Sequence, residues 1–129
     1  MNILDLIRNN QFLKKMYPQG ISDFFVGNIV LGIDNSITIA LHTKEKPSIE
    51  IAKWGKWDVN YNIVVVEFSS FLPKNISITN WESIDKSPHK LIISEVTTNN
   101  YEVTITNSTM KIIIETDKFL FQKCETYIL

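Results

Sequence analysis

Most of this sequence consists of short segments in which isoleucine, valine or phenylalanine alternates with other residues, separated by residues typical of turns. The pattern runs almost without a break from residue 29 to residue 128. Alternation with a period of two places apolar side chains on one face of a β-strand, and short strands at this spacing are typical of an antiparallel meander. We therefore expect a mostly β (α+β) fold, in which a curled antiparallel sheet or open barrel-like meander carries one short N-terminal helix docked on it.

The first hairpin is expected within "NIVLGIDNSITIAL", residues 28 to 41. It contains two alternating apolar triplets, one ending at Ile33 and the other beginning at Ile37. The triplets share a face if these two residues lie opposite each other. This pairing predicts a three-residue turn made of Asp34, Asn35 and Ser36.

The stretch "YNIVVVEF", residues 61 to 68, is apolar on both faces of a strand except at Glu67. A strand that is buried on both faces belongs in the middle of a sheet, so we expect this one to be central. Glu67 is expected to make a cross-strand ion pair or hydrogen bond. A turn at Pro73 and Asn75 leads into the next strand, which we expect to pair with the central one.

Two more hairpins are expected in the last third of the chain. A turn at Asn99-Asn100 would pair Val96 with Val103, because both asparagines tolerate a positive φ. A second turn at Asp117-Lys118 would pair the strands on either side of it, with Ile114 opposite Phe121. One core is expected to include Val66, Ile112, Ile114 and Phe121.

Only residues 11 to 17 repeat with helical spacing. Their apolar members fall on one helical face and are Phe12, Leu13, Met16 and Tyr17. Asn9 or Asn10 can cap the start of this helix, and Pro18 disfavours helical geometry at the residue before it. We expect a short helix that ends at Tyr17 and docks on the sheet through its apolar face.

The chain as a whole has the size and charge of one ordinary domain, residues 1 to 129. Its charges nearly cancel, with 13 lysines and arginines against 14 aspartates and glutamates. No basic cluster of the kind that binds phosphates is present, so nucleic acid is not expected as a ligand. The first residues do not resemble a secretion signal, and no apolar run approaches the roughly 20 residues that span a bilayer. We expect a soluble, cytoplasmic protein that does not contact a membrane.

No residue pattern in the chain indicates catalysis. His42 and His89 are far apart in the sequence, and Cys124, the single cysteine, has no partner at metal-ligand spacing. Neither a Gly-x-Ser-x-Gly signature nor a glycine-rich phosphate loop is present. We therefore expect no metal, no cofactor and no enzymatic activity.

Three tryptophans are the most prominent candidates for a functional role. Trp54 and Trp57 flank a glycine just before the central strand, and Trp81 follows the next strand. Exposed tryptophans can stack on a sugar or a base, or anchor a protein partner. Alternatively they cover the end of the core, where each would bury on the order of 200 Å². Core sealing is the favoured interpretation for Trp57 and Trp81, whereas the two interpretations are evenly matched for Trp54.

Taken in order, these segments resemble the immunity protein 50 family. The stretches that carry the resemblance are "FLKKMY", "NIVLGIDNSITIAL", the tryptophan loop, "NIVVVEFSSF", "ISITNW" and "FLFQKCETYI", from about Phe12 to Ile128. Trp57 before the long strand, Trp81 after the next one and Tyr127 near the end are its marks. Members are predicted immunity proteins of bacterial polymorphic toxin and contact-dependent inhibition systems. The resemblance implies a mostly β fold and a non-enzymatic inhibitor of a cognate toxin, and it transfers no binding residues.

Two classes of function follow. The first is an immunity protein that binds and neutralises a cognate bacterial toxin domain, which requires a stable scaffold and a complementary surface but no reactive groups. Such a protein would be a monomer or a weak homodimer, since unpaired sheet edges can associate. The alternative is a small-molecule-binding β domain whose sheet encloses an apolar cavity.

One surface is the best candidate for binding the toxin domain. If the strand at residues 61 to 68 pairs with the strand that ends at Trp81, the loop entering the first and the loop leaving the second lie side by side. The expected partner-binding residues are Trp54, Trp57, Asp58, Trp81, Glu82 and Asp85. Such a surface would combine aromatic anchors with acidic neighbours.

Overall fold

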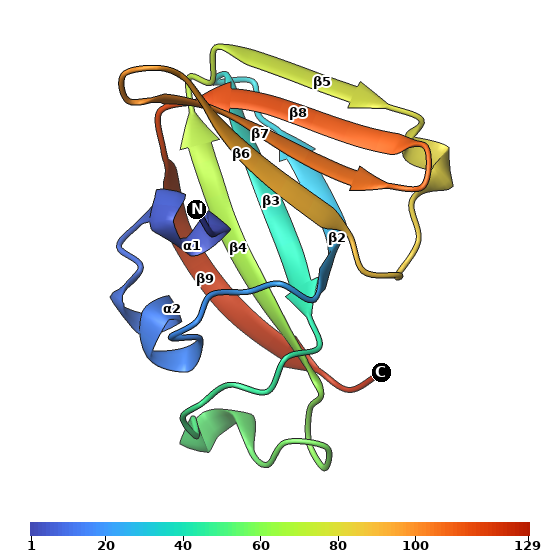
Figure 1. Ribbon diagram of the computed structural model, residues 1–129. Coiled ribbons are helices and arrows are strands. Elements are labelled where there is room, and N and C mark those ends of the chain that lie inside the picture. Colours follow the sequence, from blue (N-terminus) through green and yellow to red (C-terminus); the bar gives the residue numbers. More distant parts are fainter.

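Nine strands form two sheets that face each other across a shared core (Figure 1). The computed structural model describes residues 1–129. The first sheet contains, in spatial order, β1 (Ile7–Arg8), β9 (Phe119–Tyr127), β4 (Ile63–Phe71), β3 (Ser36–Thr43) and β2 (Phe24–Leu31). The second sheet contains β5 (Asn75–Thr79), β8 (Met110–Thr116), β7 (Asn100–Asn107) and β6 (Lys90–Thr97). All neighbouring strands are antiparallel except β1, which runs parallel to β9. The mostly β fold with a short N-terminal helix is confirmed, and its strands are divided between two sheets.

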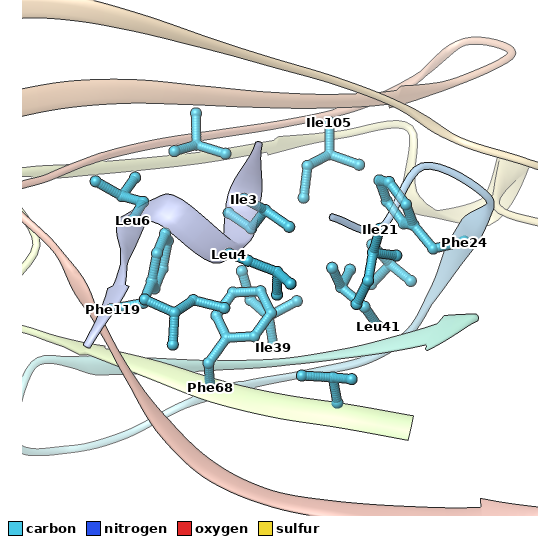
Figure 2. Close-up of a cluster of buried hydrophobic side chains, with 14 of the residues drawn as sticks. Ile3, Leu4, Leu6, Ile21, Phe24, Ile39, Leu41, Phe68, Ile105 and Phe119 are labelled. Carbon is cyan, nitrogen blue, oxygen red and sulfur yellow. The ribbon is translucent and has the colours of Figure 1, made fainter. Parts of the chain in front are cut away.

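The core between the sheets is a cluster of 23 buried residues. Figure 2 shows side chains from the first sheet, such as Ile39 and Phe68, pointing toward Ile105 of the second sheet. The residues expected to share one core do so. Val66, Ile112 and Ile114 belong to the cluster, and Phe121 packs against it.

A helix that the sequence pattern did not reveal, α1 (Ile3–Leu6), lies between the two sheets (Figure 2). Its three apolar side chains are buried, and Asn2 and Asp5 form a capping box at its start. Asn2 also joins the helix to the chain before β2, because its Oδ1 accepts from the Ile21 N–H at 3.2 Å and its Nδ2 donates to the Ile21 carbonyl at 2.9 Å. A helix of four residues has no stability of its own, so this one depends on its burial.

The expected N-terminal helix is α2 (Gln11–Met16), which ends one residue before the predicted end. Leu13 and Met16 are fully buried, as its apolar face predicts. Asn10 occupies the N-cap position but does not cap the helix with its side chain. Its Nδ2 donates instead to the Leu4 carbonyl at 2.8 Å, which ties α2 to α1.

The strand β4 lies in the middle of the first sheet, between β3 and β9, as its two apolar faces predict. One face contributes Val64, Val66 and Phe68 to the core. On the other face, Ile63 and Val65 form a small second cluster with Ala40, and Tyr127 packs against it. Both faces of β4 are therefore covered.

Glu67 does not form the expected cross-strand ion pair. It lies opposite Lys123 of β9, but the Lys123 ammonium pairs with Glu125 at 2.8 Å. The side-chain hydrogen bond from Lys123 to Glu125 raises the pKa of Lys123, and the charge of Glu67 adds to the effect. Glu67 thus acts on Lys123 only at a distance.

The expected pairing of β4 with β5 is wrong. The chain leaves the first sheet at residues 72–74, and β5 pairs with β8 in the second sheet. Asp117-Lys118 is likewise a connection between sheets, so Ile114 lies opposite Ile76 and Val103 instead of Phe121. A strand alternates in the same way whether its successor pairs with it or crosses to a facing sheet. The sequence pattern therefore identifies the strands without assigning them to sheets.

The hairpin between β2 and β3 forms in a register that differs by two residues from the expected one. Leu31, instead of Ile33, lies opposite Ile37. Ile33 is fully exposed in the turn, and Asn35 takes the positive φ of 66° that the turn requires. A shift of two residues leaves every side chain on the same face, so alternation cannot distinguish the two registers.

The hairpin between β6 and β7 is also shifted. Val103 lies opposite Ile93, and the irregularity between Glu95 and Thr97 leaves Val96 without a partner in β7. The turn residue with positive φ is Asn99. A further hairpin joins β7 to β8 at residues 108–109, where a serine and a threonine gave no strong turn signal.

Candidate functional site

The two tryptophans before β4 pack against the protein's own core. The Trp54 ring makes edge-to-face contacts with Phe12 of α2 and with Tyr61, at centroid distances of 6.1 Å and 5.9 Å. The Trp57 ring contacts Tyr61 in the same way at 5.3 Å. Both tryptophans are half-buried against the main cluster. Gly55 between them has a φ of 82°, a conformation that glycine adopts without strain. This geometry supports core sealing for Trp57 and extends it to Trp54.

Trp81 and Glu82 lie in a different part of the molecule. They belong to η2 (Trp81–Ser83), a single turn that follows β5 and lies against β8. Figure 1 places this turn (yellow) beside the second sheet, whereas the loop at residues 52–61 (green) lies beyond the far end of the first sheet. Trp81 is 39 % exposed and Glu82 is exposed. For Trp81, core sealing is therefore the weaker interpretation.

The six expected partner-binding residues do not form one surface. Trp54, Trp57 and Asp58 are separated from Trp81, Glu82 and Asp85 because β4 and β5 belong to different sheets. Asp58 is an exposed residue of the turn before β4, where its positive φ of 65° and the hydrogen bond from its N–H to the Tyr61 carbonyl, at 2.7 Å, shape the backbone.

Asp85 holds the segment after η2 in place. Its Oδ1 accepts hydrogen bonds from the Ser87 hydroxyl, from the Ser87 N–H at 2.8 Å and from Asn107 Nδ2 at 2.8 Å. These hydrogen bonds, that of the Ser87 side chain foremost, lower the pKa of Asp85 to about 2. The same segment is joined to β2 by the His89 N–H, which donates to the Phe24 carbonyl at 2.8 Å. Asp85 thus stabilises the conformation of this segment.

Exposed apolar side chains are frequent on the segments around β2 and β5. Of the fourteen exposed large apolar residues, seven come from three neighbouring segments. We call these seven residues the β2–β5 surface: Val30, Leu31, Ile33, Phe71, Leu72, Ile78 and Trp81. Val30 lies on the opposite face of β2 from Leu31, because successive strand residues alternate. The segments are joined directly, since the Leu72 N–H donates to the Asn35 carbonyl at 3.1 Å and Phe71 lies opposite Ser36. Concentrations of this kind mark interaction sites in soluble proteins.

Two adjoining hollows follow this surface. A groove of about 380 Å³ lies between β2 and the end of β5, lined by Gly27, Asn28, Ile29, Leu31, Ile78 and Trp81. A second hollow of about 430 Å³ shares Leu31 with it and reaches Leu72 and Ile76. No side chain in the lining of the first groove carries a charge. The groove therefore suits an apolar group of a partner.

Most of the β2–β5 surface was missed by sequence reasoning, although a signal was present. Ile33 stands among turn residues in "GIDNS", and Phe71 and Leu72 stand directly before Pro73. Turns are normally polar, because they lie at the surface. Large apolar residues that stand among turn residues therefore indicate a candidate interaction surface.

The two histidines and the cysteine are at least partly buried, and the histidines lie within hydrogen-bond distance of neighbouring groups. His42 Nδ1 lies 2.7 Å from the Tyr127 hydroxyl, and burial lowers the pKa of His42. His89 is buried, its Nδ1 lies 2.8 Å from the Ser87 carbonyl, and burial lowers its pKa as well. Burial raises the pKa of Cys124 to about 12, which keeps the thiol protonated. No group of three or more His, Cys, Asp or Glu side chains is arranged to hold a metal ion.

Neither the helices nor known proteins point to a role for this chain. All helices are short, and none combines the length and the apolar character that a membrane crossing requires. Comparisons with family models, with curated proteins and with solved structures find no match.

Proposed function

We propose that the protein is a non-enzymatic immunity protein that binds and neutralises a cognate bacterial toxin domain through the β2–β5 surface. The observation that carries the proposal is that three exposed apolar side chains line one uncharged groove, namely Leu31, Ile78 and Trp81. Exposed apolar area is unfavourable in water, and monomeric proteins seldom keep a large patch without a use. Tryptophan is also among the residues most enriched at interface hot spots. The segment order that resembles the immunity protein 50 family supports the same role.

Neutralisation of this kind requires no reacting group in the inhibitor. A protein that covers the working surface of a toxin excludes its substrate, and it acts in the cytoplasm of the cell that produces it. The formal net charge of −1 provides little long-range attraction. We therefore expect association at roughly 10⁵–10⁶ M⁻¹s⁻¹ with a weak dependence on salt, and affinity that comes from slow dissociation.

Co-expression in a bacterial host tests this function. The toxin domain encoded beside this gene is expressed alone and together with the protein, and growth is followed after induction. We expect growth to stop with the toxin alone and to continue when both are present. Equal killing in the two cultures would refute the proposed function.

The contribution of Trp81 can be separated from that of the core tryptophans. Trp81→Ala is expected to weaken toxin binding by about 30- to 1,000-fold, as for a hot-spot residue, with little change in melting temperature. Trp57→Ala is the matched control, because it removes a half-buried ring that packs on Tyr61. We expect this control to lower the melting temperature and to leave the affinity of the folded protein nearly unchanged. Calorimetric titration and thermal melting measure the two effects, and a reversal of the pattern would place the contact at the 52–61 loop.

A second candidate function is the binding of a small molecule, which one observation favours. The space between the sheets is occupied by α1 and the core side chains, but a hollow of about 390 Å³ lies beside the N-terminal segment and β6. His89 lies in its lining, and the buried His89 Nε2 has no hydrogen-bond partner. A ligand with an apolar body and one hydrogen-bond donor would fit this chemistry. Titration with small alcohols and amines, followed by the nitrogen chemical shifts of His89, tests it, and unchanged shifts would exclude the hollow as a site.

A further inference from the structure

The strand β2 is a free edge of the first sheet and carries no protective charge. Its eight residues, "FFVGNIVL", include no charged residue and no proline. The other free edges are guarded in ways that natural sheets commonly use. The strand β1 has two residues, β5 has five, and β6 carries Lys90 and Glu95. Of the four edges, β2 is thus the one best suited to accept another strand.

The free backbone groups of this edge can be assigned from the pairing of β2 with β3. The Gly32 N–H donates to the Ser36 carbonyl at 2.8 Å, so this pair is a hydrogen-bonded one. Hydrogen-bonded and non-hydrogen-bonded pairs alternate along an antiparallel ladder. Val30 therefore points its backbone groups toward β3, and Ile29 and Leu31 point theirs away from it.

These outward groups have no partner within the protein. Beyond its ladder with β3, β2 makes one backbone hydrogen bond, from the His89 N–H to the Phe24 carbonyl at the start of the strand. A β-bulge at Gly27 interrupts the ladder near this point. From residue 28 to Leu31 the ladder is regular, and it offers two N–H and two C=O groups to an incoming backbone.

The side chains beside these groups form the groove described above. Ile29 and Leu31 lie opposite Ile39 and Ile37, which are fully buried, so they face the same side of the sheet. On that side they line the groove together with Trp81 and other residues of its wall. A strand added to β2 would place every second side chain against this wall. Backbone hydrogen bonds and an adjoining apolar pocket are the two components of recognition by strand addition.

We propose, resting on the proposed function, that the toxin domain binds by adding an extended strand to β2 along residues 28–31. The unpaired N–H and C=O groups of β2 can form hydrogen bonds with another extended backbone. The uncharged wall of the groove is complementary to apolar side chains at alternate positions of the added strand. A charge at those positions would lose its hydration without gaining a partner. The occupant is therefore a short extended segment of the toxin domain with two apolar residues at i and i+2 and no proline opposite Ile29 or Leu31.

Amide hydrogen exchange, resolved by residue, tests this mode of binding in the unmodified protein. The probe is the purified toxin domain encoded beside this gene. In the free protein we expect the Ile29 and Leu31 amides to exchange rapidly, since neither has an acceptor. In the complex we expect their exchange to slow by at least about 100-fold, because a hydrogen-bonded amide exchanges only when the pairing opens. The amides of Asn28 and Val30, which point toward β3, should be protected in both states and serve as the internal control.

A pair of variants at one position adds an independent readout. Ile29→Pro removes the outward N–H and is compatible with an edge strand, because that N–H is not part of the ladder with β3. Ile29→Val keeps the N–H and an apolar side chain. We expect Ile29→Pro to weaken binding by about 10- to 100-fold and Ile29→Val to change it less than about threefold. If the proline variant melts at a much lower temperature than the parent protein, its binding is not interpreted and the exchange measurement alone tests strand addition.

The outcomes separate this inference from the proposed function. A complex in which the Ile29 and Leu31 amides exchange as fast as in the free protein would overturn strand addition and leave toxin binding intact. Absence of any complex would overturn both. Protection of the two amides in the protein alone, increasing with its concentration, would show that a second copy covers β2 and would overturn the toxin strand as occupant.

Discussion

Ile114 shows how single residues hold the two sheets together. Its side chain is fully buried on β8, and its neighbours in the ladder are Ile76 of β5 and Val103 of β7. Truncation at such a position loses the transfer free energy of the removed groups and leaves a cavity. We predict that Ile114→Ala lowers the free energy of unfolding by about 2–5 kcal/mol. Denaturant melting measures the change, and a loss below about 0.5 kcal/mol would mean that the site collapses around the smaller residue.

His89 makes stability depend on pH. Burial lowers its pKa in the folded protein, and the opposing effects of the Ser87 carbonyl and Asp85 are smaller. The unfolded chain therefore binds a proton more readily than the folded one, and stability rises with pH across this interval. The contribution is fully present above the ordinary histidine pKa of about 6.5 and is lost as the pH falls toward the lower folded value.

The variant His89→Asn isolates this contribution. Asparagine keeps a side-chain donor for the Ser87 carbonyl but does not titrate. We predict a smaller loss of stability between pH 6.5 and pH 5 in the variant than in the parent protein, while some slope remains because burial also lowers the pKa of His42. Denaturant melts at several pH values measure the slopes. Identical slopes would show that His89 does not titrate differently in the folded and unfolded states.

At the scale of elements, α1 acts as a plug between the sheets and depends on Asn2. This residue completes the capping box and makes two hydrogen bonds with Ile21. Asn2→Ala is predicted to cost about 1–3 kcal/mol, because it removes a cap and leaves polar groups of Ile21 unpaired. Asn75→Ala, at an exposed position on β5, is the control and should change stability by less than about 0.5 kcal/mol. Equal melting curves for the two variants would mean that the hydrogen bonds of Asn2 contribute nothing to the stability of the protein.

The elements themselves could be predicted from the sequence, but their partners could not. Alternation located the strands, and the covered faces of β4 placed it at the centre of a sheet. The register of the β2–β3 hairpin could not be predicted at Ile33, because a shift of two residues keeps every side chain on the same face of the sheet. The sequence could not show to which sheet the strands after Pro73 and after Asp117-Lys118 belong, because a connection between sheets uses the same residue types as a turn within one sheet. The helix α1 escaped notice because four residues are too few to show a helical period.

At the scale of the whole molecule, the position of β5 determines the candidate site. Because β5 joins the second sheet, Trp81 moves away from Trp54 and Trp57 and comes to lie beside the free edge β2. The sequence indicated that Trp81 and Glu82 follow a strand and lie near acidic residues. It could not indicate the apolar neighbours Ile29 and Leu31, since their proximity to Trp81 is a product of the two-sheet arrangement.

One measurement tests most directly whether the β2–β5 surface neutralises a toxin. Leu31→Asp and Ile92→Asp place the same charge at exposed apolar positions, one on β2 at 60 % exposure and the other on β6 at 62 %. Each variant is co-expressed with the toxin domain encoded beside the gene, and growth is compared with that of the parent protein. We predict that Ile92→Asp protects as well as the parent and that Leu31→Asp, present at the same level in the cell, does not protect. Full protection by Leu31→Asp would contradict the assignment of the surface.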